Sequence, residues 1–359
     1  MLVAVLAGLA CGSAARAQTI DGHLRVAGSG APLAGAFVIL RDADGREVAR
    51  TLTDAEGRFT FEAAPGRYQV QTARIGWRPW FSPPLDVPPD GVLRYTGEVD
   101  VRAVGLSAIV VRGERVCETD PGAGREIAQV WDEARKALDA VAWTRRSIPL
   151  TFELAWWERR LHANTLEVLS QEDSSWSARA SGSPFASAPA AALSAHGYIV
   201  ENDDHDWEFF GPDADVLLSP EFAADHCFYL KEREDDRRLL GLAFEPVPHR
   251  LASDIHGVLW LDRETAQLEA LEFEYANLPW VIPDESRLGG HVEFVRLETG
   301  GWVVSSWWLR MPILTITTRR VNGHKVAGYG VAALSEVGGR VGRVSLPDGN
   351  VVKAVSHTP

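Results

Sequence analysis

The chain has 359 residues, of which 46% are hydrophobic and 24% are charged, a composition typical of folded globular proteins and not of disordered or fibrous ones. Its 49 acidic residues outnumber the 36 basic ones and give a formal charge of −13, which argues against nucleic acids and anionic membranes as partners because both repel a surface of this sign. The length corresponds to about two domains.

The first 17 residues have the features of a secretory signal peptide. The apolar run at 2–11 is too short for a membrane-spanning helix, which takes roughly 20 residues, and small residues follow it. We expect cleavage between Ala17 and Gln18 and a product that is secreted to the periplasm or the outer cell envelope. No basic residue precedes the run, and a lipoprotein signal with lipidated Cys11 is the alternative. No later stretch is apolar enough to predict a transmembrane segment.

Cleavage would leave two of the three cysteines, Cys117 and Cys227. An even number of cysteines in an oxidising compartment favours a disulfide, which would join the middle of the chain to its second half. Two separately buried thiols are the alternative. Single cysteines so far apart lack the local pairing of a zinc site, and we expect no bound metal.

Residues 18–112 contain short strands separated by strong turn signals. The turns place glycine after Asp or Pro, and we expect positive φ at Gly35, Gly45, Gly57 and Gly66. Apolar and polar residues alternate along the strands, which indicates one buried and one exposed face. The expected strands lie at 24–26, 37–40, 58–61 and 68–72.

Three segments of this region carry a family resemblance: PLAGAFVIL at 32–40, TLTDAEGRFTF at 51–61 and PGRYQV at 65–70. In order and spacing they resemble the carboxypeptidase regulatory-like domain. The resemblance implies a transthyretin-like β-sandwich of seven strands, a fold also grouped with carbohydrate-binding-like folds. It brings no catalytic residue. Members of the family occur beside zinc carboxypeptidase domains, ahead of TonB-dependent receptor barrels and in many secreted proteins.

The linker at 113–147 contains one predicted helix. Apolar residues recur at three- and four-residue steps within 122–146 and charged residues lie mostly opposite them, which predicts an amphipathic helix that packs on the second domain.

Residues 148–359 predict an antiparallel β domain of six or more strands. The Asn322-Gly323 pair is the strongest hairpin signal of the chain. We expect a mainly β, curved, half-barrel-like sheet wrapped on the helix, and a loop at 181–195. The expected strands lie at 149–157, 163–171, 174–180, 196–201, 254–261, 267–276, 290–298, 302–311, 314–321 and 324–332.

Most of the 13 tryptophans lie in this second domain. Trp156 and Trp157 are adjacent, as are Trp307 and Trp308, and both pairs fall in expected strands. Because neighbours in a strand point to opposite faces, each pair predicts one indole on each side of the sheet.

Candidate catalytic residues are few. His205 and Glu208 form an H-x-x-E pattern that could hold zinc, but one chance match is nearly expected in a chain with 10 histidines. The acidic stretch around them, continued by Asp213 and Asp215, lacks the spacing of a calcium loop and is more simply a solvated turn. His226 and Cys227 are neighbours that would point apart in a strand, which favours a buried or bridged cysteine.

Trp77, Arg78, Trp80 and Phe81 gather aromatic and basic side chains near the end of the sandwich. Such a cluster can stack on a sugar ring or grip a peptide, or it can pack against the neighbouring domain.

These observations favour a secreted or periplasmic, non-catalytic binding or scaffold protein without a cofactor, whose partner is an envelope protein or a glycan. A carbohydrate-binding module is the alternative, and a zinc hydrolase that uses His205 and Glu208 is a third hypothesis. No nucleic-acid partner is expected.

Overall fold

The computed structural model describes residues 18–111, 115–117, 124–179, 184–203, 206–280, 287–321 and 324–352. The predicted signal peptide lies outside the described residues. The chain divides into two compact units. Among the described residues, unit 1 comprises 18–73 together with Pro79–Val101, and unit 2 comprises Arg74–Arg78 and those from Arg102 onward. Each unit is mainly β, as predicted.

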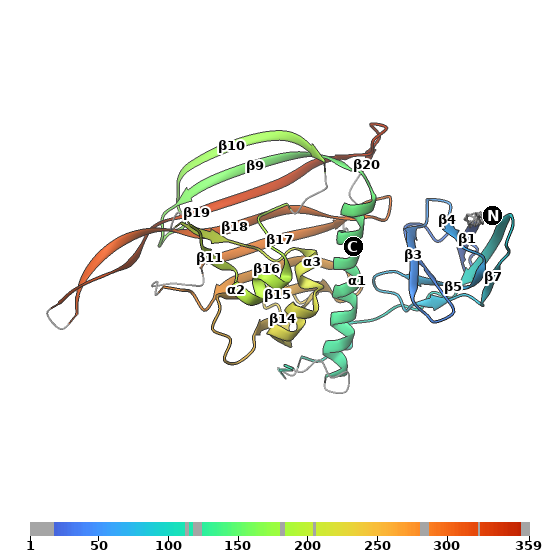
Figure 1. Ribbon diagram of the computed structural model, residues 1–359, viewed down its shortest axis with the longest axis horizontal. Coiled ribbons are helices and arrows are strands. Elements are labelled where there is room, and N and C mark those ends of the chain that lie inside the picture. The colour runs from blue at the N-terminus through green and yellow to red at the C-terminus, as the bar shows by residue number, and fades with distance from the viewer. Residues whose placement is uncertain are drawn as a thin grey trace, which may run out of the picture. The chain divides into compact units, whose positions relative to one another are not determined.

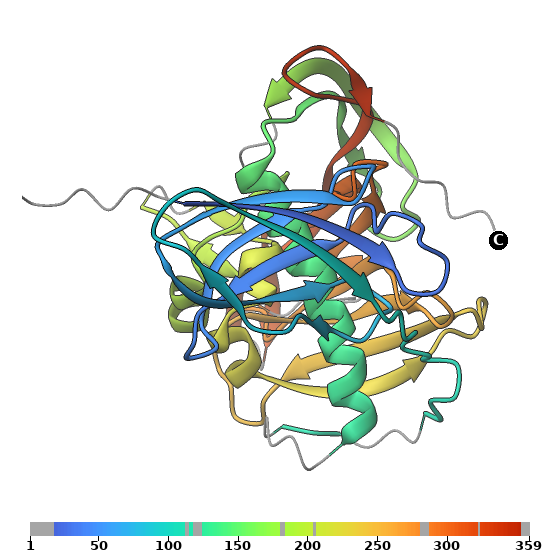
Figure 2. The same cartoon turned by 90° about the vertical axis from the view of Figure 1, so that its right-hand side faces the viewer.

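Unit 1 is a sandwich of two sheets (Figure 2). Its first sheet is formed by β4 (Arg58–Ala63), β1 (Gln18–Val26) and β8 (Val92–Val99), in that order. The second sheet is formed by β3 (Glu47–Leu52), β2 (Phe37–Arg41), β5 (Gly66–Ala73) and β6 (Trp80–Phe81), with β7 (Leu85–Val87) also paired to β5. Both sheets contribute buried side chains to the core, among them Ile20, Leu24 and Phe61 from the first and Val38, Leu40 and Val70 from the second.

Glycine is required at the turn before β4. Gly57 has a φ of +80°, and a Cβ built there would lie 2.4 Å from the carbonyl oxygen of Leu24. Gly35 and Gly45 also have positive φ, as predicted. The prediction was wrong for Gly66, because this residue is already the first residue of β5.

Unit 2 is built on one large antiparallel sheet of ten strands (Figure 1). The strand order is β10-β9-β19-β18-β17-β16-β15-β14-β13, and β20 pairs with β19. In the described part of the chain the end strands β10 and β13 do not pair with each other, so this sheet is open. The bounds are β9 (Thr151–Leu161), β10 (Val168–Arg179), β13 (His226–Glu232), β14 (Leu239–Pro246), β15 (Asp254–Asp262), β16 (Leu268–Ala276), β17 (Gly289–Arg296), β18 (Trp302–Val321), β19 (His324–Ser345) and β20 (Val351–Val352).

One face of the large sheet is covered by helices, and we call it the inner face. The predicted amphipathic helix is α1 (Arg125–Ser147), and the ring of its Trp131 lies 5.1 Å from that of Phe228 on β13. The remaining elements are α2 (Ala190–His196), α3 (Ala214–Leu217), α4 (Pro220–Asp225) and a small sheet of β11 (Ile199–Glu201) and β12 (Trp207–Phe209). None of the described helices is long and apolar enough to cross a membrane.

The alternation of side chains confirms the prediction for the two tryptophan pairs. Trp156 and Trp307 point to the inner face, where their rings touch with centroids 5.1 Å apart. Trp157 and Trp308 therefore point to the opposite face, which we call the outer face.

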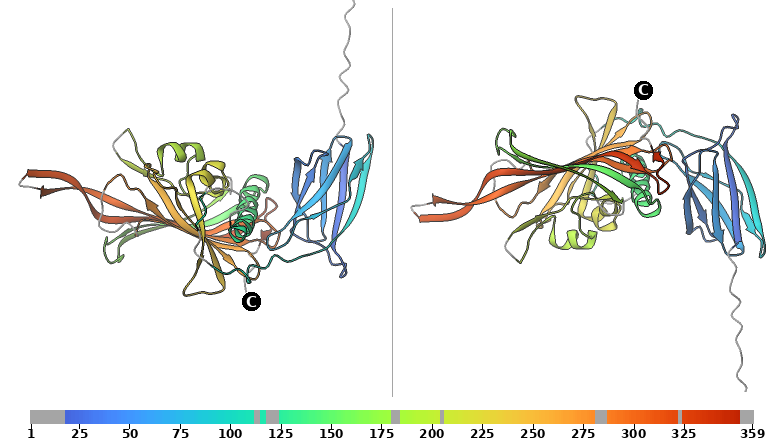
Figure 3. Two further views of the ribbon diagram at one scale, coloured as in Figure 1. Left: turned by 90° about the horizontal axis from the view of Figure 1, so that it is seen from below. Right: turned by 90° about the horizontal axis from the view of Figure 1, so that it is seen from above.

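The predicted strands 302–311 and 314–321 form one continuous strand, β18. Pairing with β17 ends at Arg310, and beyond Pro312 the strand pairs only with β19. Proline has no N–H to donate, so it fits where β18 becomes an edge of the sheet. The β18–β19 hairpin then continues as a two-stranded ribbon past the neighbouring strands (Figure 3). The Asn322-Gly323 turn itself lies outside the described residues.

Two further predictions need correction. The expected strands 163–171 and 174–180 are replaced by the single strand β10, and α2 occupies part of the expected loop at 181–195.

The C-terminal end of α1 is fixed to the sheet by Thr144. Its hydroxyl oxygen accepts a hydrogen bond of 3.0 Å from the backbone N–H of Trp302, the first residue of β18. Thr144 is fully buried, and a Cβ at Gly301 would lie only 3.0 Å from its methyl carbon. The close approach of helix and strand thus depends on this side chain.

We predict that Thr144→Val lowers the free energy of unfolding by about 1–3 kcal/mol, because the buried N–H of Trp302 loses its acceptor while the side-chain volume is kept. Urea unfolding measures the change. Thr144→Ser is the control, since it keeps the hydroxyl and loses one methyl group, at a cost of about 0.8 kcal/mol. A valine variant as stable as the wild type would contradict this role.

Candidate functional site

A cavity of about 280 Å³ lies on the inner face, between α1 and the strands that carry the aromatic side chains. Aromatic and aliphatic residues dominate its wall, and its few charged groups are Arg145, Arg179 and Asp213. The aromatic lining residues are Phe152, Trp156, Trp176, Phe185, Phe294, Trp302 and Trp307.

The aromatic rings of the cavity contact one another. The ring of Trp156 lies 5.7 Å from that of Trp176, and Phe185 lies 5.7 Å from Trp307. Trp307 is 2% exposed, and it packs over Gly339 of β19, where a Cβ would lie 2.9 Å from the indole nitrogen. A larger residue at position 339 would push Trp307 into the cavity.

One end of the cavity is polar, and its charges are paired. Arg145 lies 3.4 Å from Asp213 and also forms an ion pair with Asp215. Asp213 in addition accepts a hydrogen bond of 3.0 Å from the backbone N–H of Val216 and so caps α3. The two aspartates considered for calcium therefore bind arginine and a helix end. Within the described ranges, no group of three or more His, Cys, Asp or Glu side chains could hold a metal ion.

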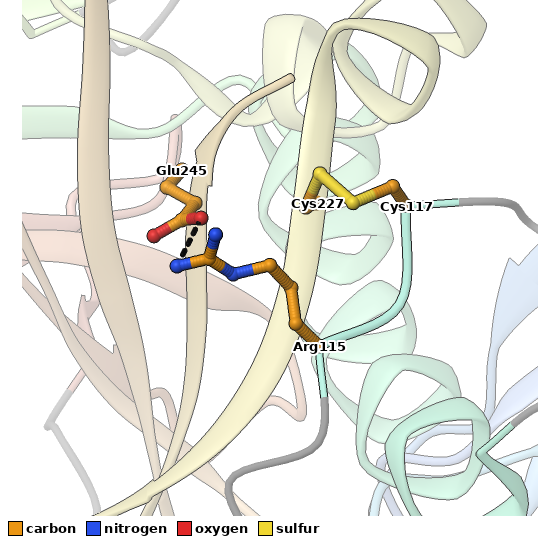
Figure 4. Close-up of a disulfide and its surroundings, with 4 residues drawn as sticks. All are labelled: Arg115, Cys117, Cys227 and Glu245. Atoms are coloured by element: carbon orange, nitrogen blue, oxygen red, sulfur yellow. Dashed lines mark ion pairs between the residues drawn. A yellow bond between two sulfur atoms is a disulfide. The ribbon is translucent and has the colours of Figure 1, made fainter. Parts of the chain in front are cut away.

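The structure joins Cys117 and Cys227 in a disulfide, which supports the predicted pairing (Figure 4). The backbone of Val116 exchanges two hydrogen bonds with Phe228, of 2.8 and 2.7 Å, so the segment 115–117 lies along the edge of β13. Arg115 forms an ion pair of 2.6 Å with Glu245 beside it (Figure 4). The segment that leads to α1 is thereby attached to β13. This strand lies at one end of the large sheet, and β9 and β10 lie at the other end.

The residues of the hydrolase hypothesis do not form a described site. His205 lies outside the described residues, and Glu208 is exposed on β12, where its carboxylate accepts a 3.4 Å hydrogen bond from Asn202. His226 is buried, with its two ring nitrogens 2.9 Å from the carbonyl oxygen of Phe222 and 3.2 Å from that of Ile255. Its neighbour Cys227 is in the disulfide, as favoured from the sequence.

The predicted cluster of Trp77, Arg78, Trp80 and Phe81 is divided between the two units. Trp77 and Arg78 belong to the segment Arg74–Arg78 of unit 2, whereas Trp80 and Phe81 form β6 in unit 1. Phe81 is 48% exposed. Ligand binding by these four residues stays a prediction.

A buried carboxylate holds the segment Arg74–Arg78 on α1. Glu133 is 1% exposed, and it accepts a 2.8 Å hydrogen bond from the backbone N–H of Gly76. Burial raises the pKa of this carboxyl group, and the ammonium group of Lys136, 2.6 Å away, offsets part of the effect. The same ammonium group donates to the carbonyl oxygen of Trp77 at 3.3 Å. The part of the cluster that lies in unit 2 is thus packed against the helix.

The outer face of the large sheet carries a row of side chains that the sequence did not reveal as a group. Trp157 on β9 is paired with Gly338 on β19, and Gly338 is paired with Trp308 on β18. The same row continues to His291 on β17 and Glu272 on β16. The only sequence signal was the presence of adjacent tryptophans, because the row depends on the register of five strands.

The next row on the outer face is charged. Arg159 and Arg310 both form ion pairs with the buried carboxylate of Glu336, at 3.2 and 2.6 Å. Each guanidinium also lies over an indole, Arg159 at 5.1 Å from the ring centre of Trp157 and Arg310 at 4.6 Å from that of Trp308. These contacts place a guanidinium group against one face of each indole.

Glu293 lies on the other side of the tryptophan row. Its carboxylate is 3.5 Å from the imidazole of His291 and accepts a 2.5 Å hydrogen bond from the hydroxyl of Ser306. The hydrogen bond with His291, the Ser306 hydroxyl and the nearby charge of Arg340 lower the pKa of Glu293 to about 2, against the opposing effect of burial.

One part of the chain matches a known protein family. Residues 19–102 match the family model of the carboxypeptidase regulatory-like domain. This match confirms the resemblance seen in the sequence, and it covers unit 1 but leaves the large sheet of unit 2 outside the family. The regulatory-like domain is a non-catalytic module. No curated protein matches the chain.

Several solved structures resemble parts of the chain at low similarity. One is the 5-hydroxyisourate hydrolase of Klebsiella pneumoniae, with 21% identity over 24% of this chain and 93% of the other, at a TM-score of 0.18. A DUF1329 family protein of Desulfovibrio piger has 11% identity over 65% of this chain and 95% of the other, at a TM-score of 0.25. The major pilin subunit BcpA of Bacillus cereus has 9% identity over 95% of both chains, at a TM-score of 0.18.

Opening the disulfide is expected to destabilise unit 2 by about 2–4 kcal/mol, because it closes a long loop of the unfolded chain. The two cysteines are 110 residues apart in the sequence. Thermal unfolding with and without dithiothreitol measures the loss, and the reductant should leave the double variant Cys117→Ala with Cys227→Ala unaffected. Equal melting temperatures of the wild type in both conditions would show that the bond adds no stability.

The lowered pKa of Glu293 predicts a loss of stability in acid. Because the folded-state pKa lies near 2, below the ordinary value of 4.5, the contribution of this carboxylate is present above pH 4.5 and is lost as the pH falls towards 2. Solvent reaches the side chain, which is 52% exposed, so we expect less than about 1 kcal/mol.

Chemical unfolding of Glu293→Gln between pH 5 and pH 2.5 tests this effect, and the variant should lose less stability over the interval than the wild type. Ser306→Ala, which removes one donor to the carboxylate, should fall between the two. Parallel pH profiles of all three proteins would contradict the assignment.

Proposed function

We propose that the protein is a secreted or periplasmic binding protein whose unit 2 takes an apolar ligand into the inner-face cavity. The single observation that carries the proposal is the aromatic wall of this cavity. The regulatory-like domain is then a non-catalytic module attached to the binding unit.

The lining of the cavity defines the chemistry of the ligand. A concave site with aromatic walls and few polar groups is the usual form of a site for an apolar small molecule. Arg145 is already paired with two aspartates, so the polar end offers little net charge to a charged ligand. The volume of about 280 Å³ is slightly below that of most ligand pockets, which measure roughly 300–1,000 Å³. We therefore propose that a small apolar molecule, or the apolar end of a larger one, occupies it.

The disulfide supports the location part of the proposal. Stable disulfides form in oxidising compartments such as the bacterial periplasm and the cell exterior, and are rare in the cytosol. The predicted signal peptide points to the same compartments. An apolar ligand in such a compartment needs a carrier or a receptor that shields it from water.

The test is fluorescence titration with N-phenyl-1-naphthylamine, a neutral apolar dye. We expect the wild type to bind the dye and Val341→Phe to bind it at least about tenfold more weakly, since Val341 lines the cavity and the added ring occupies its volume. Val168→Phe is the matched control, because Val168 is 49% exposed on β10 and does not line the cavity.

The proposal predicts unchanged dye binding for the control. It is overturned if the wild type does not bind the dye, or if the Val341→Phe and Val168→Phe variants bind it equally well. Melting temperatures of both variants check that each is folded.

A further inference from the structure

The outer face of the large sheet is hollowed at the tryptophan row, independently of the inner cavity. A groove of about 550 Å³ is lined by residues of four strands, Ala155, Trp157, Arg159, His291, Glu293, Ser306, Trp308, Glu336 and Arg340. A second hollow of about 510 Å³ continues from it across β17, β16 and β15, and shares His291 and Trp308. Trp157 and Trp308 are both half-buried, so part of each indole faces the groove.

The indoles are held in place before any ligand arrives. A Cβ at Gly338 would lie 2.3 Å from Cζ2 of Trp157, which shows that this indole lies directly over the glycine between the two tryptophan strands. Trp308 is stacked on the imidazole of His291, with ring centres 6.2 Å apart and planes 14° from parallel. A fixed aromatic surface of this kind binds with little loss of side-chain entropy.

The charges around the two indoles balance one another. Arg159 and Arg310 share Glu336, and Glu293 faces His291 and the charge of Arg340. Glu272 lies 3.8 Å from His291, so three arginines stand beside three glutamates. An anionic ligand would meet the carboxylates, and a cationic ligand would meet the arginines. A neutral ligand with many hydroxyl groups meets no such conflict, because a hydroxyl both donates to carboxylates and accepts from guanidinium groups.

The positions of the tryptophans indicate the size of this ligand. Trp157 and Trp308 are two strands apart, with Gly338 between them, so their backbones are separated by about 10 Å, or two strand spacings. The groove at these indoles continues into the second hollow, which reaches β16 and β15, and the two together give room for a chain of several sugar rings. The apolar face of a sugar ring packs on an indole in the way other flat apolar groups do.

We propose that the outer face binds a neutral oligosaccharide in the groove between Trp157 and Trp308. Sugar rings pack on the two indoles, and Glu293, Arg340 and Arg159 hydrogen-bond to the hydroxyl groups. This site lies on the opposite face of the sheet from the cavity of the proposed function and does not depend on it.

The test is isothermal titration calorimetry of the full chain with cellohexaose, xylohexaose, mannohexaose and chitohexaose. We expect at least one of them to bind, and Trp157→Ala and Trp308→Ala each to weaken that binding by about tenfold or more. Trp176→Ala is the matched control, because Trp176 is also partly exposed, at 44%, but lines the inner-face cavity. It should bind the oligosaccharide as the wild type does.

Two further variants distinguish loss of the binding site from loss of the folded structure. Trp157→Phe and Trp308→Phe keep an aromatic ring and should retain most of the affinity. The alanine variants should still bind N-phenyl-1-naphthylamine, and Val341→Phe should still bind the oligosaccharide, so failure of one site is distinguished from failure of the other.

The proposal is wrong if none of the four neutral oligosaccharides binds at millimolar concentration. It is equally wrong if both alanine variants bind as tightly as the wild type. Binding of an oligogalacturonate, tested in parallel, in place of all the neutral sugars would contradict the argument from balanced charges.

Discussion

The packing of α1 on the inner face of the large sheet is the contact on which the rest of unit 2 depends. Its apolar side buries Val130, Ala134 and Leu138 completely, which stabilises the sheet by removing a broad aromatic surface from water. Three polar side chains of the same helix then fix three other segments: Glu133 binds the segment Arg74–Arg78, Thr144 binds the start of β18, and Arg145 binds the acidic residues of α3. The last turns of this helix form one wall of the cavity, and the aromatic strands form the other.

The parts of the fold that could be predicted are those with a regular local pattern. The alternation along β4 and β5 and the period of α1 were visible because each of these elements has one buried and one exposed side. β14 gave no such signal, since Leu239–Phe244 is buried on both faces and its residues are apolar throughout. β18 was divided in two because Pro312 resembles a strand end, and only the pairing with β19 shows that the strand continues.

The candidate sites show a different limit of sequence reasoning. The cysteine pair followed from an even count, and the placement of one indole of each tryptophan pair on each face followed from strand geometry. The partners of those tryptophans did not follow, because Trp157, Gly338, Trp308 and His291 are brought together only by the register of four strands. The cluster near Trp77 shows another limit. Its residues are close in the sequence but belong to two different units, and ligand binding by them stays a prediction.

The glycine pair in β19 has a consequence for how unit 2 can change by mutation. Gly338 lies under Trp157 on the outer face, and Gly339 lies against Trp307 on the inner face. The addition of one methyl group at either position meets an indole, at 2.3 Å in the first case and 2.9 Å in the second, but on opposite sides of the same strand. Substitutions at two neighbouring positions therefore affect two separate surfaces. Even alanine at one of them would displace an indole on one face of the sheet and leave the other face unchanged.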